Sequence, residues 1–177
     1  MIYPYRHWQP EIAPTAFIAP SADVIGRVTI GADANIWHQS VLRGDVHDIV
    51  IGARSNIQDH STLHTSDGVT PCIVGDDVTV GHRVILHGCE IQDGCLVGMG
   101  SIIMDQAVLE AGCLLAAGSL VTERKVLKGG FLYAGSPARE IRPLRDEEKA
   151  FLQRSAAHYV EVARHHQQAL QASGQVS

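Results

Sequence analysis

The chain has 177 residues, of which 45% are apolar, so it fits a single domain with a buried core. Its formal net charge is -5, and it has no Lys/Arg cluster with interleaved aromatic residues, which argues against a nucleic-acid partner. No apolar run approaches the roughly 18 residues of a membrane span, and the first residues, "MIYPYRHWQPEIAP", lack the pattern of a secretion signal. We therefore expect one soluble, cytoplasmic domain over residues 1–177 that binds neither nucleic acid nor membrane.

Aliphatic residues recur every six positions through most of the chain, in four phased blocks. They are Ile12, Ile18, Val24, Ile30, Ile36 and Leu42, then Ile51, Ile57 and Leu63, then Val74, Val80 and Leu86, then Ile91, Val97, Ile103, Leu109, Leu115 and Val121. A second column of mostly small residues lies four positions after the first. This period fits neither an α-helix nor simple alternation, but it fits a parallel β-helix of six-residue strand-and-turn units. We expect a mainly β fold over about residues 11–125, with the aliphatic residues stacked along its axis.

The four cysteines lack the paired C-x-x-C spacing of a four-cysteine zinc site. Cys95 and Cys113 fall in the column of small residues, and Cys89 precedes Cys95 by six positions. We interpret these cysteines as interior packing of the β-helix.

After Val121 the sequence predicts a connector over residues 126–143 and a single helix over residues 144–171. Leu152, Ala156, Tyr159 and Ala163 recur at helical spacing, with acidic residues early in the segment and Arg and His late, as helices prefer. We expect this amphipathic helix to pack along the β-helix. Its histidines, His158, His165 and His166, are interpreted as solvated or packing residues.

Four polar residues interrupt the repeat in the central blocks, in the slot directly after the aliphatic residue: Arg43, Gln58, His64 and His87. Three six-residue units make one coil, so residues three units apart lie on one face in adjacent coils, about 4.8 Å apart. The longer spacings after Leu42 and Leu63 are interpreted as a three-residue bulge and a five-residue loop within "TSDGVTPC". Under that interpretation Arg43, His64 and His87 stack on one face, and the two histidines are close enough to share a metal ion.

His82 occupies a different slot and lies on the preceding face, together with Gln58 and Asp59. It can hardly reach the same ion as His64 and His87 of its own chain. A second copy of the chain resolves the mismatch, because His82 of a neighbour meets His64 and His87 under cyclic three-fold symmetry.

Three neutral imidazoles with an open fourth position are typical of a catalytic zinc site, although imidazole also suits iron or cobalt. The alternative is that each histidine separately fills a corner of the solenoid and hydrogen-bonds to a carbonyl group. His7, His38, His47 and His60 lack this register and are interpreted as surface or structural residues. Of these, His60 is adjacent to Asp59 and would lie near the site.

Five segments together resemble the gamma class of carbonic anhydrases and their bacterial homologues over roughly residues 10–145: "LRGDVHDIVIG", "NIQDHSTLH", "VGHRVILHGC", "VGMGSIIMDQAVLEAG" and "YAGSPAR". The resemblance implies a left-handed β-helix, against the usual right-handed crossover. It also implies a homotrimer with three sites at subunit interfaces, and the zinc-dependent reversible hydration of carbon dioxide to bicarbonate.

The resemblance further implies roles for individual residues. Gln58 would orient the bound hydroxide or bicarbonate, with Asn56 on the other side of the pocket. Arg43, Asp45 and Asp59 would form charged contacts across the interface, either as part of the catalytic site or only as contacts that hold the trimer together. Tyr133 matches a tyrosine near the pocket of relatives, and a packing role is the alternative.

Two departures from the family pattern bear on the rate. Val46 stands where well-known active members carry a glutamate, and the loop after His64 has Asp67 as its only acid. Because fast turnover needs the proton removed from zinc-bound water, Asp67 is a weak substitute for an acidic shuttle loop. The sequence therefore supports metal binding more strongly than rapid catalysis.

Three other functions are considered. The same zinc site could serve a thioesterase or other hydrolase acting on acyl-coenzyme A, which needs a wider apolar mouth. An acyltransferase of this repeat class has no use for three histidines in this register. A metal-binding trimer with little or no catalytic activity, or a scaffold, is the last alternative.

Overall fold

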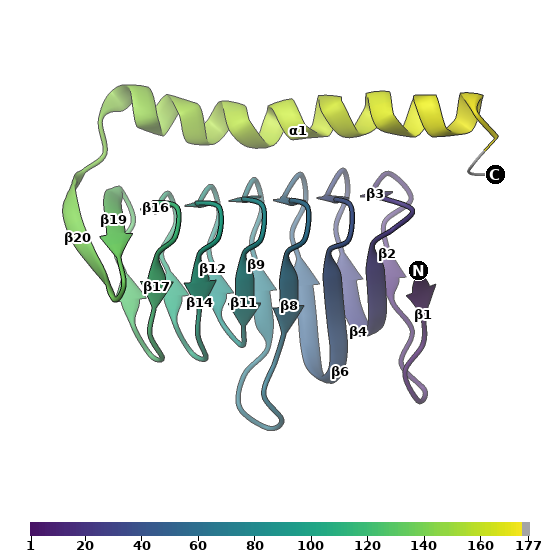
Figure 1. Ribbon diagram of the computed structural model, residues 1–177, viewed down its shortest axis with the longest axis horizontal. Helices are drawn as coiled ribbons and strands as arrows, with labels where there is room; N and C mark the ends of the chain where they lie inside the picture. Colours follow the sequence, from purple (N-terminus) through teal and green to yellow (C-terminus); the bar gives the residue numbers. More distant parts are fainter. Residues whose placement is uncertain (175–177) are drawn as a thin grey trace.

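The structure is a computed structural model that describes residues 1–174. It is a parallel β-solenoid of about seven turns with one C-terminal helix, α1 (Asp146–Ala172), lying along its length (Figure 1). The helix begins at the last coil and runs back toward the first, so the described C-terminal end lies near the N-terminus. The β-helix with a C-terminal helix that the sequence predicts is confirmed.

The strands stack into three faces, because each coil contributes one strand to each. The first face contains β1 (Ile2–Tyr3), the first halves of β4 (Asp23–Ile30) and β6 (Val41–Ile51), then β8 (Thr62–His64), β11 (Ile85–His87), β14 (Ile102–Ile103) and β17 (Leu120–Val121). The second contains β2 (Glu11–Ile12), the remaining halves of β4 and β6, then β9 (Cys72–Val74), β12 (Glu90–Ile91), β15 (Val108–Leu109) and β18 (Val126–Leu127). The third contains β3 (Phe17–Ile18), β5 (Asn35–Ile36), β7 (Asn56–Ile57), β10 (Thr79–Val80), β13 (Leu96–Val97), β16 (Leu114–Leu115) and β19 (Phe131–Gly135), with β20 (Ala138–Pro143) antiparallel to β19.

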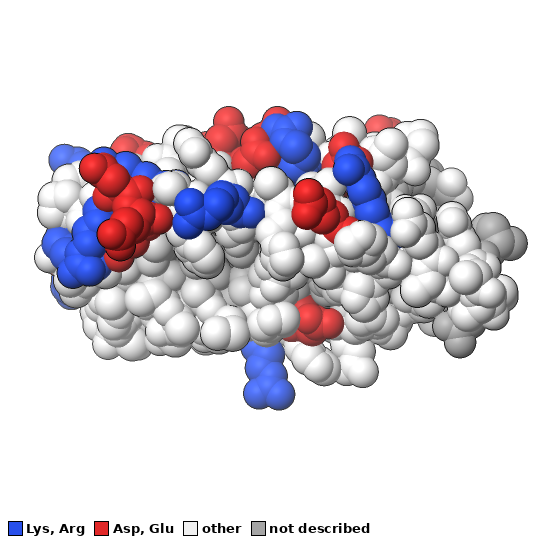
Figure 2. Space-filling view, turned by 90° about the horizontal axis from the view of Figure 1, so that it is seen from above, with Lys and Arg blue, Asp and Glu red and all other residues white. Residues whose placement is uncertain are grey.

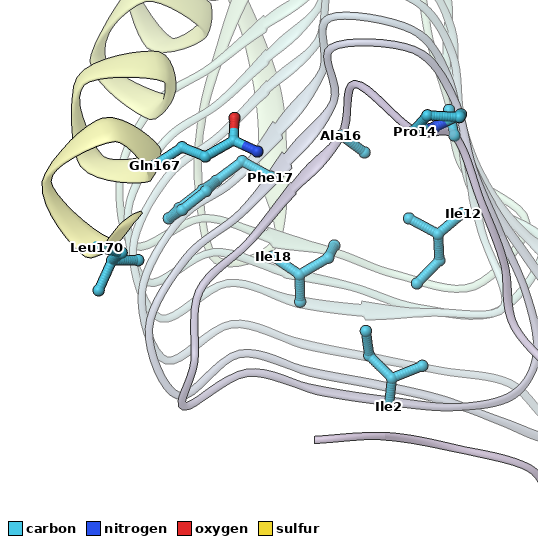
Figure 3. A pocket seen from close by; sticks show the side chains of 9 residues that line it. Ile2, Ile12, Pro14, Ala16, Phe17, Ile18, Gln167 and Leu170 are labelled. Atoms are coloured by element: carbon cyan, nitrogen blue, oxygen red, sulfur yellow. The ribbon is translucent and has the colours of Figure 1, made fainter. Parts of the chain in front are cut away.

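The core is the column of aliphatic residues that the six-residue period predicts. Every member from Val24 to Val121 is at most 2% exposed. Ile12 and Ile18 are less buried because they belong to the first coil, which no further coil covers. They line a cavity of about 340 Å³ at this N-terminal end of the solenoid (Figure 3). Serine hydroxyl groups in the column of small residues form hydrogen bonds with neighbouring coils. Ser40 Oγ, for example, donates to the Gln58 carbonyl at 2.9 Å.

The four cysteines are free and buried in this core. Burial raises the pKa of Cys95 to about 12 and raises that of Cys113 further. The interpretation of the cysteines as interior packing is confirmed.

The two irregular spacings are accommodated as the sequence predicts. Val24 pairs with Leu42, and Ile30 pairs with Ile51, with a register shift between Gly26 and Val28 that absorbs the bulge in β6. The loop at residues 65–71 leaves the next coil in phase, because Ile51 then pairs with Val74.

The segment 126–143 is not the connector that the sequence suggested. Leu127 and Tyr133 continue the six-residue phase from Val121 and pair with Leu109 and Leu115. The solenoid therefore extends through β18 and β19 before the β19–β20 hairpin leads to the helix. The charges and paired glycines of "ERKVLKGG" obscured this coil, whose outward positions are solvent-exposed.

Helix α1 packs on the third face through its predicted apolar positions. Leu152, Ala156 and Ala163 are buried there. Trp37 of the third face contacts the helix, with its ring centroid 5.8 Å from that of Tyr159 and 5.0 Å from that of His166. The helix therefore covers the third face and leaves the first and second faces open.

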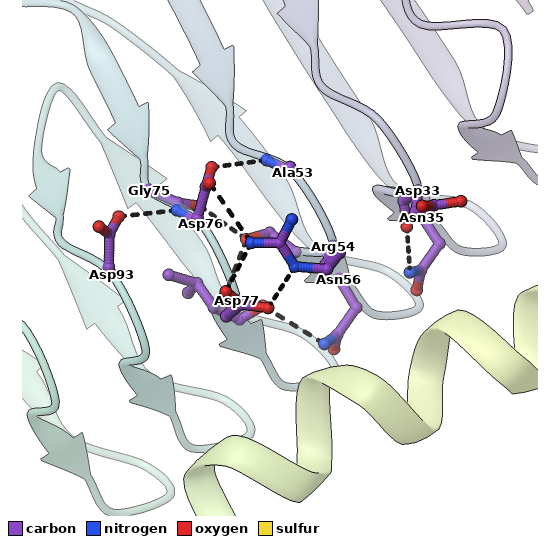
Figure 4. A network of polar contacts seen from close by, with 11 residues as sticks. Asp33, Asn35, Ala53, Arg54, Asn56, Gly75, Asp76, Asp77 and Asp93 are labelled. Atoms are coloured by element: carbon purple, nitrogen blue, oxygen red, sulfur yellow. Dashed lines mark hydrogen bonds and ion pairs between the residues drawn. The ribbon is translucent and has the colours of Figure 1, made fainter.

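Carboxylates at the corner between the second and third faces tie adjacent coils together (Figure 4). Asp76 Oδ1 accepts a hydrogen bond from the Ala53 amide at 2.7 Å, and Asp93 Oδ1 accepts one from the Asp76 amide at 2.8 Å. Arg54 binds Asp77 through Nε and Nη2, each at 2.7 Å, and these hydrogen bonds, helped by the charge of Asp77, raise the pKa of Arg54. These contacts repeat along the axis and stabilise the stacking of the coils.

Acidic and basic side chains are interspersed on the helix-covered face, with wide uncharged areas between them (Figure 2). Within residues 1–174, no helix combines the length and the apolarity needed to cross a bilayer.

Candidate metal centre

Two predicted ligands, His64 and His87, lie side by side at the corner between the first and second faces. They end β8 and β11 and are paired in register, as the repeat predicts. His64 Nδ1 lies 3.2 Å from His87 Nε2, and the two side chains are 19% and 30% exposed.

Each of these rings has a carboxylate at its other nitrogen. Asp45 Oδ1 lies 2.9 Å from His64 Nε2, and Asp105 Oδ1 lies 2.7 Å from His87 Nδ1. A neutral imidazole that donates to a carboxylate keeps a lone pair on its second nitrogen. The two nitrogens that face each other at 3.2 Å are then both acceptors, and a cation would satisfy both.

The distance between these nitrogens fits zinc. A tetrahedral zinc ion with Zn–N bonds of about 2.0–2.1 Å separates two ligating nitrogens by about 3.3–3.4 Å. Carboxylates that fix the far side of ligating imidazoles are a common feature of such sites. The donor set present at this corner therefore fits one half of a zinc site.

Asp45 is held by the bulge of β6 and paired with Arg43. Burial would raise the pKa of Asp45, but hydrogen bonds from Arg43 and His64 outweigh it, so the pKa is lowered and the carboxylate stays charged. Gly44 allows this bulge, because a Cβ there would lie 2.5 Å from the Arg27 carbonyl oxygen.

Asp105 is a site residue that the sequence analysis missed. It lies in the turn after β14 and also accepts a hydrogen bond from Ser66 Oγ at 2.8 Å, which ties the 65–71 loop to the site. A signal was present, since Asp105 follows His87 by 18 residues, which is one coil in this part of the chain.

His82 lies at the opposite edge of the first face, in the turn between β10 and β11. Its Nδ1 is 2.9 Å from Asp59 Oδ2, and its side chain is 42% exposed. In the described part of the chain, no group of three or more His, Cys, Asp or Glu residues is arranged to hold a metal. Within one chain, His82 therefore does not join His64 and His87.

Gln58 and Asn56 lie on the side of His82 and not of the histidine pair. Gln58 Nε2 donates to Asn56 Oδ1 at 3.0 Å, and Asn56 Nδ2 donates to Thr79 Oγ1 at 3.0 Å. Thr79 in turn donates to Ser155 Oγ of α1 at 2.9 Å. This chain of hydrogen bonds fixes the Gln58 amide, which lines a cavity of about 380 Å³ with His82.

Tyr159 of α1 lines the same cavity and was assigned only to helix packing. Burial raises the pKa of Tyr159, the Asp59 charge raises it further, and a hydrogen bond with Gln58 only partly opposes them. The phenol is therefore protonated at neutral pH. Nothing in the sequence links Tyr159 to Gln58, because helix docking alone brings them together.

Comparisons with known proteins identify relatives of the chain. No family model matches the chain. A carbonic anhydrase of Geobacillus kaustophilus is 50% identical over 161 residues, which cover 91% of this chain and 88% of that protein. The mitochondrial gamma carbonic anhydrase 1 of Arabidopsis thaliana is 44% identical over 162 residues, 89% of this chain and 59% of the longer plant protein. The chain belongs to the gamma carbonic anhydrase family.

A solved structure is also similar to this chain over most of its length. It is a hexapeptide transferase family protein from Anaplasma phagocytophilum, with 47% identity, a TM-score of 0.88, and coverage of 91% of this chain and 95% of that one. The family resemblance that the sequence motifs indicated is confirmed.

The remaining predicted site residues, Tyr133, Asp67 and His60, belong neither to the His64–His87 pair nor to the group of Gln58 and Asn56 beside His82. Tyr133 is 4% exposed in the interior column, where its hydroxyl accepts a hydrogen bond from the Lys128 amide at 2.9 Å. Those contacts fit the packing alternative, and a catalytic role for Tyr133 stays a prediction. Asp67 is exposed in the 65–71 loop, and His60 is an exposed turn residue with a φ of 62° beside Asp59.

Proposed function

We propose that the protein catalyses the reversible hydration of carbon dioxide at zinc sites shared between the subunits of a homotrimer. The observation that carries this proposal is the pair of imidazole nitrogens of His64 and His87, 3.2 Å apart, each ring held by a carboxylate. Membership of the gamma carbonic anhydrase family supports the same reaction.

The third ligand in this proposal is His82 of a neighbouring subunit. With Nδ1 bound to Asp59, its Nε2 keeps a free lone pair on a half-exposed side chain. His82 and the pair of His64 and His87 lie at opposite edges of the first face, so a subunit can offer one edge to each of two neighbours. Cyclic three-fold symmetry then completes three identical sites.

The outward side of the first face supports such an assembly. Adjacent outward positions on β11, β14 and β17 hold Ile85, Ile102 and Leu120, which stack in register. Ile85 is 40% exposed in the single chain. An apolar row between the two halves of the site favours burial against another copy of the chain.

In the assembled site the chain's residues would position and hold the reactants. Bound zinc would supply the Lewis acidity that makes water a nucleophile near neutral pH. The water oxygen bonds to the carbon of carbon dioxide, a proton leaves, and bicarbonate forms. Gln58, held by Asn56, presents a fixed amide beside His82, and Asp45, Asp59 and Asp105 hold the protons on the far nitrogens of the three rings.

We expect turnover to be slow for this family. Val46 provides no carboxylate beside Asp45, and Asp67 is the only acid in the loop that follows His64. Each cycle must pass one proton to solvent, and Asp67 is the one acid that this loop offers for the transfer.

Hydrolysis of acyl thioesters by the same zinc site is a second candidate. The cavity beside His82 has the apolar mouth that such a substrate needs, and the Anaplasma relative is described as a transferase family protein. A metal-binding trimer with little catalysis is the third. Assays of carbon dioxide hydration and of acyl-coenzyme A hydrolysis on one zinc-loaded sample separate the three.

The shared site is tested by mixing subunits. We expect the wild-type trimer to bind one zinc ion per chain, and His64→Ala and His82→Ala alone to bind almost none. Trimers refolded from an equal mixture of the two variants should regain zinc and activity, because some interfaces then join an intact His64–His87 pair to an intact His82. His60→Ala is the matched control, because His60 is exposed in the turn equivalent to that of His82, and it should bind zinc normally. Absence of zinc from the wild type, or no recovery in mixed trimers, contradicts the proposal.

A further inference from the structure

The cavity beside His82 is larger than the proposed reaction needs. It measures about 380 Å³, within the range of small-molecule pockets, whereas carbon dioxide and bicarbonate have three and four heavy atoms. It lies between the third face and α1, one wall coming from β13 and the turns around it and the other from the helix. Much of its lining has no role in hydrating carbon dioxide.

The two ends of this cavity differ in chemistry. Gln58, His82 and Tyr159 form the polar end, next to the edge where the metal would bind. Leu96, Met99 and Phe151 form an apolar end, and the last two are 57% and 50% exposed. Single exposed apolar side chains are common, but these two line one cavity together with Leu96, and a contiguous apolar surface of this kind commonly marks a binding site.

We propose that this cavity binds the apolar tail of a small monocarboxylate, whose carboxylate takes the place of bicarbonate at the polar end. Bicarbonate is itself a carboxylate with a hydroxyl group where a monocarboxylate carries its chain. An aliphatic or aromatic chain attached at that position extends from His82 toward Met99 and Phe151. The position of the head group rests on the proposed function, and the position of the tail rests on the cavity alone.

Two groups at the polar end favour a carbonyl or carboxylate oxygen. Tyr159 keeps its proton at neutral pH and offers an O–H donor. Ser155 also lines the cavity, and because it accepts from Thr79, its own hydroxyl can serve as a second donor. Asp59 opposes a free anion in the absence of metal, and zinc would reverse that local charge.

The consequence is an affinity that increases with chain length. Each methylene that is buried on binding strengthens it by up to about fourfold, since its transfer from water is worth about 0.8 kcal/mol. Acetate should bind weakly, and butanoate, hexanoate and octanoate progressively more tightly until the cavity is filled. The same acids should compete with bicarbonate in the zinc-loaded protein.

The test is calorimetric titration of the zinc-loaded and metal-free protein with these four acids. Ala117→Phe adds a ring to an exposed turn residue that lines the cavity and should abolish the dependence on chain length while leaving acetate binding unchanged. Ala111→Phe is the matched control, because it adds the same ring to the equivalent turn one corner earlier, outside this cavity, and should keep the wild-type dependence.

The outcomes separate this inference from the proposed function. Equal affinities across the wild-type series, or a dependence that persists in Ala117→Phe, overturn the inference even if zinc binds and carbon dioxide is hydrated. A dependence on chain length in a protein that binds no zinc supports the tail site and overturns the proposed function. Loss of the dependence in both Phe variants also counts against the cavity, since only one ring lies within it.

Discussion

At the scale of single residues, all three predicted ligands share one feature, an aspartate beside the imidazole ring. His64, His82 and His87 each have one ring nitrogen against an aspartate, and the other nitrogen of each can serve as a metal ligand. The aspartate selects the tautomer and limits rotation of the ring, so less order has to be imposed when a metal binds. The carboxylates are therefore as much a part of the candidate metal centre as the imidazoles.

Replacement of Asp105 tests this role. We expect Asp105→Ala to weaken zinc binding by about 10–100-fold, because His87 loses the partner that orients it. Asp105→Asn should lose less, because it keeps an oxygen acceptor for the His87 Nδ1–H. Competition with a chelator measures the change. Asp93→Ala removes a carboxylate that accepts a backbone hydrogen bond at another corner, and it should leave zinc affinity unchanged.

At the scale of elements, the junction between the β19–β20 hairpin and α1 depends on Glu148. Its carboxylate accepts hydrogen bonds from Arg142 at 2.7 and 2.8 Å and from the Arg145 amide at 2.8 Å. The bonds from Arg142, followed by that from Arg145, lower the pKa of Glu148 from 4.5 to about 2. One side chain thus links the last strand to the first turn of the helix.

This pKa predicts a dependence of stability on pH. Because the folded pKa lies below the unfolded one, the contribution of Glu148 is fully present above about pH 4.5 and is lost as the pH falls toward 2. We expect Glu148→Gln to lower the melting temperature by about 1–3 °C at pH 7 and the difference from wild type to vanish near pH 2. Glu147→Gln, at the neighbouring exposed position, is the control. An equal difference at both pH values contradicts this assignment.

At the scale of the whole molecule, the three faces have different environments. The third is covered by α1, which buries its outward Asn35, Asn56 and Thr79. The first carries an apolar row between the two parts of the proposed metal site. The outward row of the second, Val50, Ile73, Glu90, Val108 and Val126, is interrupted by Glu90 and borders that site at one edge only. A solenoid gains its stability from the packing of each coil on the next. A substitution of an outward side chain in the middle of the solenoid therefore affects the association of subunits more than the stability of the fold.

This difference between faces predicts where a charge disrupts the oligomer. Ile85→Asp places a charge in the middle of the first face and should convert trimers to folded monomers that bind no zinc. Val126→Asp introduces the same charge at an outward residue of the second face, where the side chain is 51% exposed, and should leave the trimer intact. Sedimentation velocity measures the assembly state, and circular dichroism checks the fold. If the Ile85→Asp variant remains trimeric, the interface does not lie on the first face.

Much of the candidate site was predictable because the repeat converts sequence spacing into position. Each six-residue unit is one side of a coil, so counting units placed His64 beside His87 and His82 at another corner. The same count could have found Asp105, one coil after His87, and the final coil through Leu127 and Tyr133. The period therefore contained enough information to predict both Asp105 and the final coil.

The sequence by itself determined the coil, its interior columns and the neighbours along each face, because hydrogen bonding between successive strands enforces one regular geometry. Only the tertiary structure decided what surrounds Gln58. Tyr159 and Ser155 reach it from a helix about 100 residues later in the chain, and no period relates that helix to the solenoid. The docking of α1 depends on how Trp37, Leu152 and Ala156 pack together. Such packing is set by side-chain shapes in three dimensions, and it created both the fixed Gln58 amide and the cavity beside His82.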